Sequence, residues 1–140
     1  MKKITLSLFF VLTTSWLSAQ IDSTAFMKKL CSINDVSEVT PISTTTFKEK
    51  YVMKMKQQVD WKTLSQGTFN ERIIIGYKGE DRPTVLVTEG YYADYGMKPN
   101  YEEELSQMFD ANVILCEYRY FAQSTPQPAN WDYMTVDNSL

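Results

Sequence analysis

The chain has 140 residues, of which 44% are hydrophobic, 22% charged and 14% aromatic, a composition typical of a globular protein. Its 14 basic and 17 acidic residues give a net charge of −3, so there is no strong electrostatic signal for nucleic-acid binding. The sequence contains no histidine, which excludes a Ser-His-Asp or Cys-His catalytic centre completed within these residues. Two cysteines are too few for a structural zinc site, and we expect neither a metal nor a cofactor.

Residues 1–19 have the layout of a secretory signal peptide. Lys2 and Lys3 give a basic start, residues 4–17 are apolar or uncharged, and the small Ala19 precedes Gln20. The apolar run is shorter than the ~20 residues that a membrane-spanning helix needs. The alternative is a buried N-terminal helix. The pattern predicts cleavage between Ala19 and Gln20, a secreted or periplasmic protein, and no stable membrane span after the signal is removed.

Residues 20–46 are expected to form an N-terminal helix and an extended arm. Apolar residues at helical spacing predict a helix over residues 21–33, capped by Asp22 or Ser23. Residues 35–46 are polar and β-branched and contain a proline, which favours an extended arm. Cys31 and Cys116 either pair in an oxidising compartment or remain free, with Cys116 as a buried thiol.

Two strands joined by the loop 62–67 are expected next. Over residues 47–61 apolar residues alternate with lysines, which predicts a half-exposed strand whose lysines can protect a sheet edge against mispairing. Residues 68–77 are centred on three consecutive isoleucines and predict a second strand. We expect these two strands to pair antiparallel.

A strand–helix–strand unit follows the polar turn at residues 78–83. The apolar run 84–88 predicts a strand covered on both faces, and residues 112–116 predict another. Between them, residues 101–109 predict a helix with one apolar face, formed by Tyr101, Leu105, Met108 and Phe109. The three glutamates at 102–104 suit the positive end of this helix better than a metal site.

Short links around this helix predict a right-handed parallel crossover. Thr135 is expected to cap a further helix beginning at Val136, in which the sequence ends. The predicted fold class is α/β, an antiparallel hairpin followed by a βαβ unit in an incomplete sheet. Because compact sheets usually hold more strands, we expect the first part of a larger α/β domain.

The best candidates for chemistry follow the two parallel strands, because open α/β sheets bind ligands at the carboxyl ends of their strands. Gly90 either lets backbone N–H groups approach a ligand, as in an oxyanion hole, or only closes a tight turn. Glu89 and Glu117 either form a carboxylate pair or bind a cationic group such as a peptide amino terminus. Equally, Glu117 pairs with Arg119 or Arg82 as a structural contact.

Aromatic residues at the same strand ends either line a pocket or pack in the core, namely Tyr91, Tyr92, Tyr118, Tyr120 and Phe121. The candidate substrate-binding residues are therefore Glu89, Tyr92, Glu117 and Arg119, and the candidate oxyanion-hole region is Gly90 with Tyr91. The sequence contains no G-x-S-x-G, no phosphate-binding loop and no dinucleotide fingerprint.

Four segments between residues 47 and 140 carry a known pattern. Residues 59–61 with 67–72 are similar to PVDH…GTFxQR, and residues 82–91 are similar to DRPxVLxTEGY. Residues 117–126 are similar to EHRYFGxSxP, and residues 131–135 to WxYLT. Together they resemble the secreted tripeptidyl aminopeptidases, serine peptidases related to the prolyl carboxypeptidase group. The sequence departs from the pattern where Trp61 and Tyr118 replace histidines and Ala122 replaces a glycine.

The resemblance implies that residues 47–140 are the N-terminal portion of an α/β-hydrolase domain. This family releases short peptides from free amino termini by Ser-Asp-His acyl transfer, and its fold places the nucleophile after the next strand, beyond residue 140. No catalytic residue is therefore assigned here, and the chain alone is expected to be inactive. The resemblance places Gly90 and Tyr91 in the loop beside the oxyanion hole, and Glu117 and Arg119 at the family's strand-end pair. The alternative is a non-catalytic exported remnant or binding module.

Overall fold

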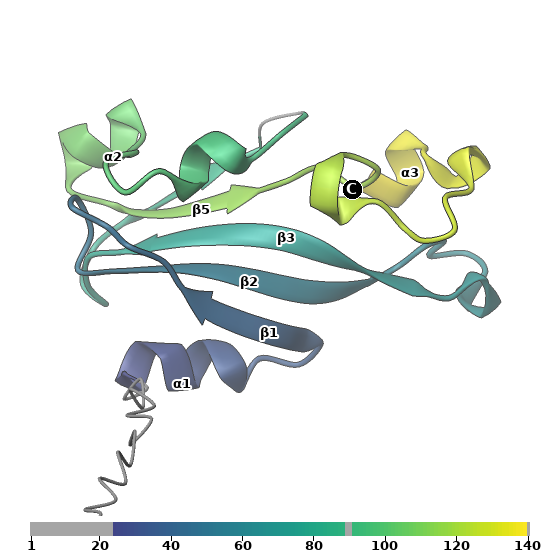
Figure 1. Cartoon of the computed structure of the whole chain (residues 1–140), viewed down its shortest axis with the longest axis horizontal. Coiled ribbons are helices and arrows are strands. Elements are labelled where there is room, and N and C mark those ends of the chain that lie inside the picture. The colour runs from purple at the N-terminus through teal and green to yellow at the C-terminus, as the bar shows by residue number, and fades with distance from the viewer. Residues whose placement is uncertain (1–23, 89–90, 140) are drawn as a thin grey trace, which may run out of the picture.

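The computed structural model describes residues 24–88 and 91–139. The predicted signal peptide with its cut at Ala19 and Gln20, the predicted caps Asp22 and Ser23, and the site candidates Glu89 and Gly90 lie outside these residues. The described chain forms one five-stranded mixed sheet in the order β1-β2-β3-β5-β4, with α1 beneath β1 and with α2 and α3 on the far side of β5 in Figure 1. This is the predicted α/β class.

Three antiparallel strands make up the first part of the sheet. They are β1 (Val36–Pro41), β2 (Glu49–Gln58) and β3 (Thr68–Tyr77). The predicted β2–β3 hairpin is confirmed, with Tyr51 opposite Ile75. The predicted extended arm contains β1, which pairs antiparallel with β2.

β1 pairs with β2 on the side away from β3, so β2 is an interior strand. The expectation that the lysines of β2 protect a sheet edge is therefore wrong. Lys50 is itself buried, and its ammonium group donates to the carbonyl of Lys98 at 2.8 Å.

The second part of the sheet is the predicted parallel unit. β4 (Thr84–Val87) and β5 (Asn112–Cys116) run parallel, connected through α2 (Glu104–Phe109), and β5 lies between β3 and β4. β4 is thereby an edge strand of the described sheet. The expectation that it is covered on both faces is wrong here, since the side chain of Leu86 is 61% exposed.

The helices are shorter than predicted. α1 spans Ala25–Cys31, and the hydroxyl oxygen of Thr24 caps it by accepting from the backbone N–H of Met27 at 3.0 Å. α2 begins only at Glu104, so Tyr101 precedes it. α3 spans Val136–Ser139, and the predicted cap is confirmed because the hydroxyl oxygen of Thr135 accepts from the backbone N–H of Asn138 at 3.3 Å.

The predicted apolar face of α2 points away from the sheet. Ser106 is the buried residue of this helix, and its hydroxyl donates to the carbonyl of Ala111 at 2.7 Å. Leu105, Met108 and Phe109 are exposed instead. Helical periodicity predicts which residues share the apolar face. The opposite side of the helix, which carries Ser106 and its hydrogen bond, is the side that lies against the sheet.

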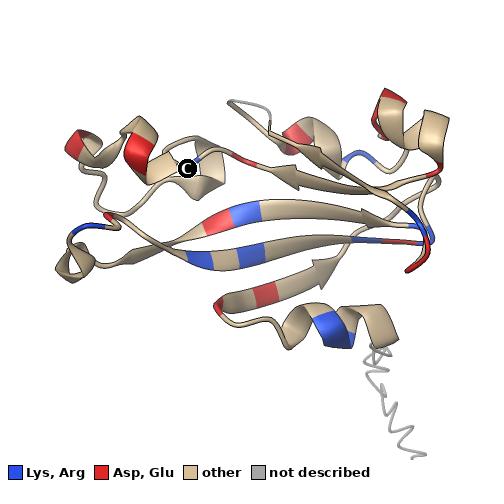
Figure 2. Cartoon of the chain, turned by 180° about the vertical axis from the view of Figure 1, so that it is seen from behind, with Lys and Arg blue, Asp and Glu red and all other residues tan. Residues whose placement is uncertain are grey.

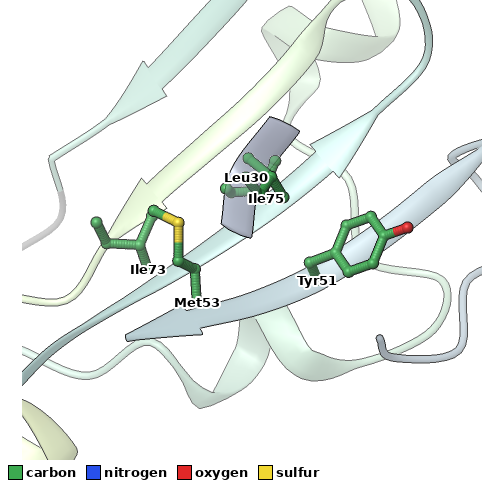
Figure 3. Packing of buried hydrophobic residues seen from close by; sticks show 5 residues of the cluster. All are labelled: Leu30, Tyr51, Met53, Ile73 and Ile75. Atoms are coloured by element: carbon green, nitrogen blue, oxygen red, sulfur yellow. The ribbon is translucent and has the colours of Figure 1, made fainter. Parts of the chain in front are cut away.

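Apolar side chains cover both faces of the sheet because strand residues alternate between them. On the α1 face, Leu30 packs on Tyr51, Met53, Ile73 and Ile75 (Figure 3). On the α2 face the buried cluster consists of Phe47, Ile74, Ala93, Val113 and Leu115. These two apolar clusters hold the strands in place, and with them the strand ends at which the candidate residues lie.

Charged residues are spread over many elements rather than gathered on one (Figure 2). No helix in the described ranges is long and apolar enough to cross a membrane. No group of three metal-ligating residues occurs in the same ranges. Cys31 and Cys116 are both free thiols, which is one of the two alternatives that the sequence left open.

Candidate functional site

The carboxylate of Glu117, directly after β5, is at the centre of a buried polar network. Its side chain has no exposed surface, and one oxygen forms an ion pair with Arg72 and accepts from the backbone N–H of Ala93 at 3.2 Å. The other oxygen accepts from the hydroxyl of Ser124 at 3.0 Å and from the backbone N–H groups of Gln123 and Ser124. Glu117 is thus fully occupied within the fold, which favours the structural alternative over substrate binding.

Arg72, in β3, is the partner of Glu117, so the suggested pairing with Arg119 or Arg82 is wrong. The other end of its guanidinium lies 2.6 Å from the carboxylate of Asp94. A hydrogen bond from Tyr92 and the nearby Arg72 both hold the pKa of Asp94 below its ordinary value. The network therefore ties β3 and β5 to the segment that follows the candidate oxyanion loop.

Arg119 lies at the same end of the sheet, and within the described residues its two terminal nitrogens donate to backbone carbonyls while its buried Nε has no partner. Arg119 donates to the carbonyls of Gln58 and Val59 at 2.8 and 2.7 Å, and to the carbonyl of Asn138 in α3. Its guanidinium also stacks over the ring of Phe69 at 5.1 Å. The structure does not bring Arg119 and Glu117 together as a pair. Arg119 instead fastens the end of β2 to α3.

The aromatic candidates divide into two groups. Tyr120 is buried, which is the core-packing alternative, and its hydroxyl donates to the carbonyl of Asn130 at 2.8 Å. Tyr91 and Tyr92 are exposed, and the ring of Tyr91 meets that of Phe121 edge-on at 5.0 Å. Tyr118 donates to the carbonyl of Thr88 at 2.8 Å and so links the ends of β4 and β5. Of the candidate oxyanion region, the structure describes Tyr91, which is exposed.

A cleft of about 870 Å³ opens at this end of the sheet. Its lining includes Trp61, Phe69, Glu71, Tyr118, Arg119, Phe121 and residues 134–139. Two aromatic residues of this lining, Trp61 and Tyr118, are the ones that replace histidines of the resembling pattern. The cleft combines apolar walls with a few polar groups, the usual character of a ligand site.

Sequence reasoning missed Glu71 in this cleft. Burial raises the pKa of the Glu71 carboxyl above its ordinary value, while the charge of Arg119 and a hydrogen bond with Gln57 act in the opposite direction. A signal was available, because Glu71 shares the alternation of Ile73 and Ile75, which point into the α1-face core. A carboxylate on the apolar side of a strand indicates a special environment.

The geometry offers a cleft that can hold a ligand, and no histidine is present in the sequence to shuttle protons. The sequence pattern of the family described as PS-10 peptidase S37 matches residues 19–139. Over 85 residues the chain is 38% identical to the prolyl tri/tetrapeptidyl aminopeptidase of Streptomyces mobaraensis. That match covers 61% of this chain and 17% of the relative, so the chain spans about a sixth of the relative's length. The chain belongs to the PS-10 peptidase S37 family and corresponds to an N-terminal portion of its members.

Proposed function

We propose that this chain is the N-terminal portion of an exported serine aminopeptidase that releases tripeptides, or similarly short peptides, from free amino termini. The observation that carries the proposal is the family match over residues 19–139. The relative's name, prolyl tri/tetrapeptidyl aminopeptidase, suggests cleavage after proline as the first specificity to test.

The strand order supports an α/β-hydrolase fold. β5 inserts between β3 and β4, which leaves β4 at the edge with its carboxyl end beside the cleft. A further parallel strand next to β4 would end at this same side, where α/β sheets carry their active sites. A serine on the turn after that strand would then face the segment that follows β4.

The residues of this chain would position the groups that take part in the reaction. In acyl transfer, a serine attacks the peptide carbonyl, a histidine moves the proton, and backbone N–H groups stabilise the oxyanion. The loop of Gly90 and Tyr91 is the proposed source of one such N–H group. The Arg72–Glu117–Ser124 network would hold the neighbouring backbone in place. The chain by itself is proposed to be inactive.

The signal layout of residues 1–19 supports export to the periplasm or the medium. N-terminal sequencing of the protein recovered from those fractions tests this. A mature chain beginning at or near Gln20 is expected, whereas an intact Met1 in the cytoplasm would contradict export.

The test of function begins with the reading frame downstream of codon 140. An in-frame continuation with G-x-S-x-G, then aspartate and histidine, is expected. The protein made from the complete frame should release tripeptides from a chromogenic tripeptide amide with proline in third place. Replacing the serine of that motif by alanine should abolish the release. A complete frame that folds but cleaves no such substrate would overturn the proposal and favour the non-catalytic alternative.

A further inference from the structure

The short helix α3 is held against the connection between β2 and β3, at the end of the sheet that carries the cleft (Figure 1). We call residues 59–63 of this connection the tip segment. Asn138, the buried residue of α3, is at the centre of the contact. Its side-chain oxygen accepts from the backbone N–H of Trp61 at 3.1 Å, and its side-chain nitrogen donates to the carbonyl of Tyr133 at 3.1 Å.

The side-chain nitrogen of Asn138 has a second N–H group, which is donated to the carboxylate of Asp60. Asp60 is buried in the tip segment, and its carboxylate also accepts from the backbone N–H of Lys62 at 3.1 Å and from Thr63. Burial alone would raise the pKa of Asp60, but these hydrogen bonds hold it below its ordinary value. Asp60 is therefore ionised at neutral pH and organises the tip segment around its charge.

Arg119 joins the same two segments through their backbone. Its guanidinium donates to the carbonyl of Val59 at 2.7 Å and to the carbonyl of Asn138. All the polar groups of the Asn138 side chain, and its carbonyl, are thus used to connect α3 with its surroundings.

The charged side chains around Asp60 in the described chain are Lys62 in the tip segment, Arg119 after β5 and Asp137 in α3. Lys62 and Asp137 form an ion pair at 2.7 Å, but both side chains are largely exposed, and such pairs contribute little. The buried amide of Asn138 is therefore the side chain on which the contact between α3 and the tip segment mainly depends.

The two segments joined in this way form one wall of the cleft, which is lined by Trp61 and residues 134–139. We propose that Asn138 is a positioning residue that holds α3 against the tip segment through Asp60 and Trp61, and thereby keeps this wall of the cleft in place. The effect on catalysis rests on the proposed function, in which α3 precedes the strand whose following turn would carry the serine. Displacing α3 would then displace the nucleophile.

The first test replaces the amide by a carboxylate of the same shape. Asn138→Asp keeps an oxygen acceptor but removes both N–H donors and places a second negative charge beside Asp60. At pH 7 the hydrogen-exchange protection of the Trp61 backbone N–H should fall by about tenfold or more, because like charges repel and α3 separates. At about pH 4 one carboxyl of the pair takes up a proton and can donate again, so the protection should return.

Asn130→Asp is the matched control. Asn130 is exposed, and its side-chain oxygen accepts from the backbone N–H of Asp132, a role that a carboxylate keeps. This variant should show the protection of the unaltered chain at both pH values. Loss of protection in both variants, in neither, or in Asn138→Asp without recovery in acid would overturn the proposal.

If Asn138→Asp does not fold, as judged by circular dichroism, the unaltered chain supplies the measurement. Protonation of Asp60 in an NMR titration should shift the signal of the Asn138 side-chain amide. An unmoved signal would refute the contact.

The catalytic consequence is measured separately, on the protein made from the complete frame. Asn138→Asp should lower kcat by about tenfold or more and change KM less than kcat, since a displaced nucleophile slows the chemical step. Asn130→Asp should change neither. An unaltered kcat in Asn138→Asp would overturn the positioning role. If the unaltered complete protein cleaves no peptide, the proposed function fails, whereas the exchange measurements still decide whether Asn138 holds α3.

Discussion

Arg72 in β3 and Glu117 at the end of β5 form an ion pair in which neither side chain is more than 3% exposed. Removing Glu117 leaves Arg72 with Asp94 as its ion-pair partner and leaves the buried donors of Ala93 and Ser124 without their acceptor, and breaking a buried pair typically costs about 3–5 kcal/mol. Since single domains are stable by only about 5–15 kcal/mol, Glu117→Ala should unfold the chain or greatly lower its urea midpoint. Glu80→Gln, which removes an exposed pair with Lys29, should leave the midpoint unchanged. Equal midpoints for both variants would show that the buried pair does not hold the strand ends.

Ser124 is a second component of this network. Its hydroxyl accepts from the backbone N–H of Arg72 at 2.9 Å and donates to Glu117 at 3.0 Å, with no exposed surface. Ser124→Ala leaves a buried donor and part of a carboxylate without partners, and we expect a loss of about 1–3 kcal/mol in the free energy of unfolding. Ser139→Ala, at an exposed position, is the control and should change it little. A Ser124→Ala variant as stable as the control would argue against this contribution.

Gly76 lies beneath the ring of Phe47, where a Cβ atom would come within 2.6 Å of the ring carbons. Gly76→Ala should therefore destabilise the chain by about 1–3 kcal/mol through overpacking. Phe47→Leu shortens the opposing side chain, so the double variant should lose less stability than the sum of the two single variants. Strict additivity in chemical denaturation would show that these residues are not in steric contact.

Glu71 should make stability depend on pH. Burial raises its pKa in the folded state, so its contribution is fully present below the ordinary carboxyl value and is lost as pH rises through the raised value. Glu71→Gln removes that loss. The variant should melt at a higher temperature than the unaltered chain at pH 7, and the difference should vanish near pH 4. A difference that is constant across this range would contradict the assignment to Glu71.

Cys116 should resist alkylation. Burial is the main cause that raises the pKa of its thiol to about 11, whereas Cys31 is exposed. Iodoacetamide at pH 8 should modify Cys31 in the folded chain, and Cys116 only after denaturant is added, as followed by peptide mass spectrometry. Finding neither thiol reactive even in denaturant without reductant would indicate a disulfide between them.

Local patterns predicted the strands well because period-two alternation and apolar β-branched runs are properties of a few adjacent residues. The β2–β3 hairpin and the parallel β4–β5 pair are confirmed for this reason. Alternation within one strand does not predict which other strands pair with it on either side. The arm containing β1 was therefore not recognised as the partner of β2, and the lysines of β2 were assigned to an edge that β1 occupies.

Glu117 and Arg119 follow the end of β5, as the strand pattern predicts, but the strand-end rule does not reveal their partners. Those come from Arg72, 45 positions earlier in the chain, and from carbonyls near residues 58 and 138. The apolar residues of α2 illustrate the same limit, since periodicity defines a face without saying what covers it.

The position of β4 at the edge of the described sheet affects how the chain can be handled. An edge strand offers unpaired backbone donors and acceptors, and the exposed Leu86 adds an apolar contact beside them. Copies of the chain at high concentration can add to one another along such an edge, so β4 is the segment where aggregation is expected to start. Replacing Leu86 by lysine is accordingly the first change to make when a more soluble preparation is needed.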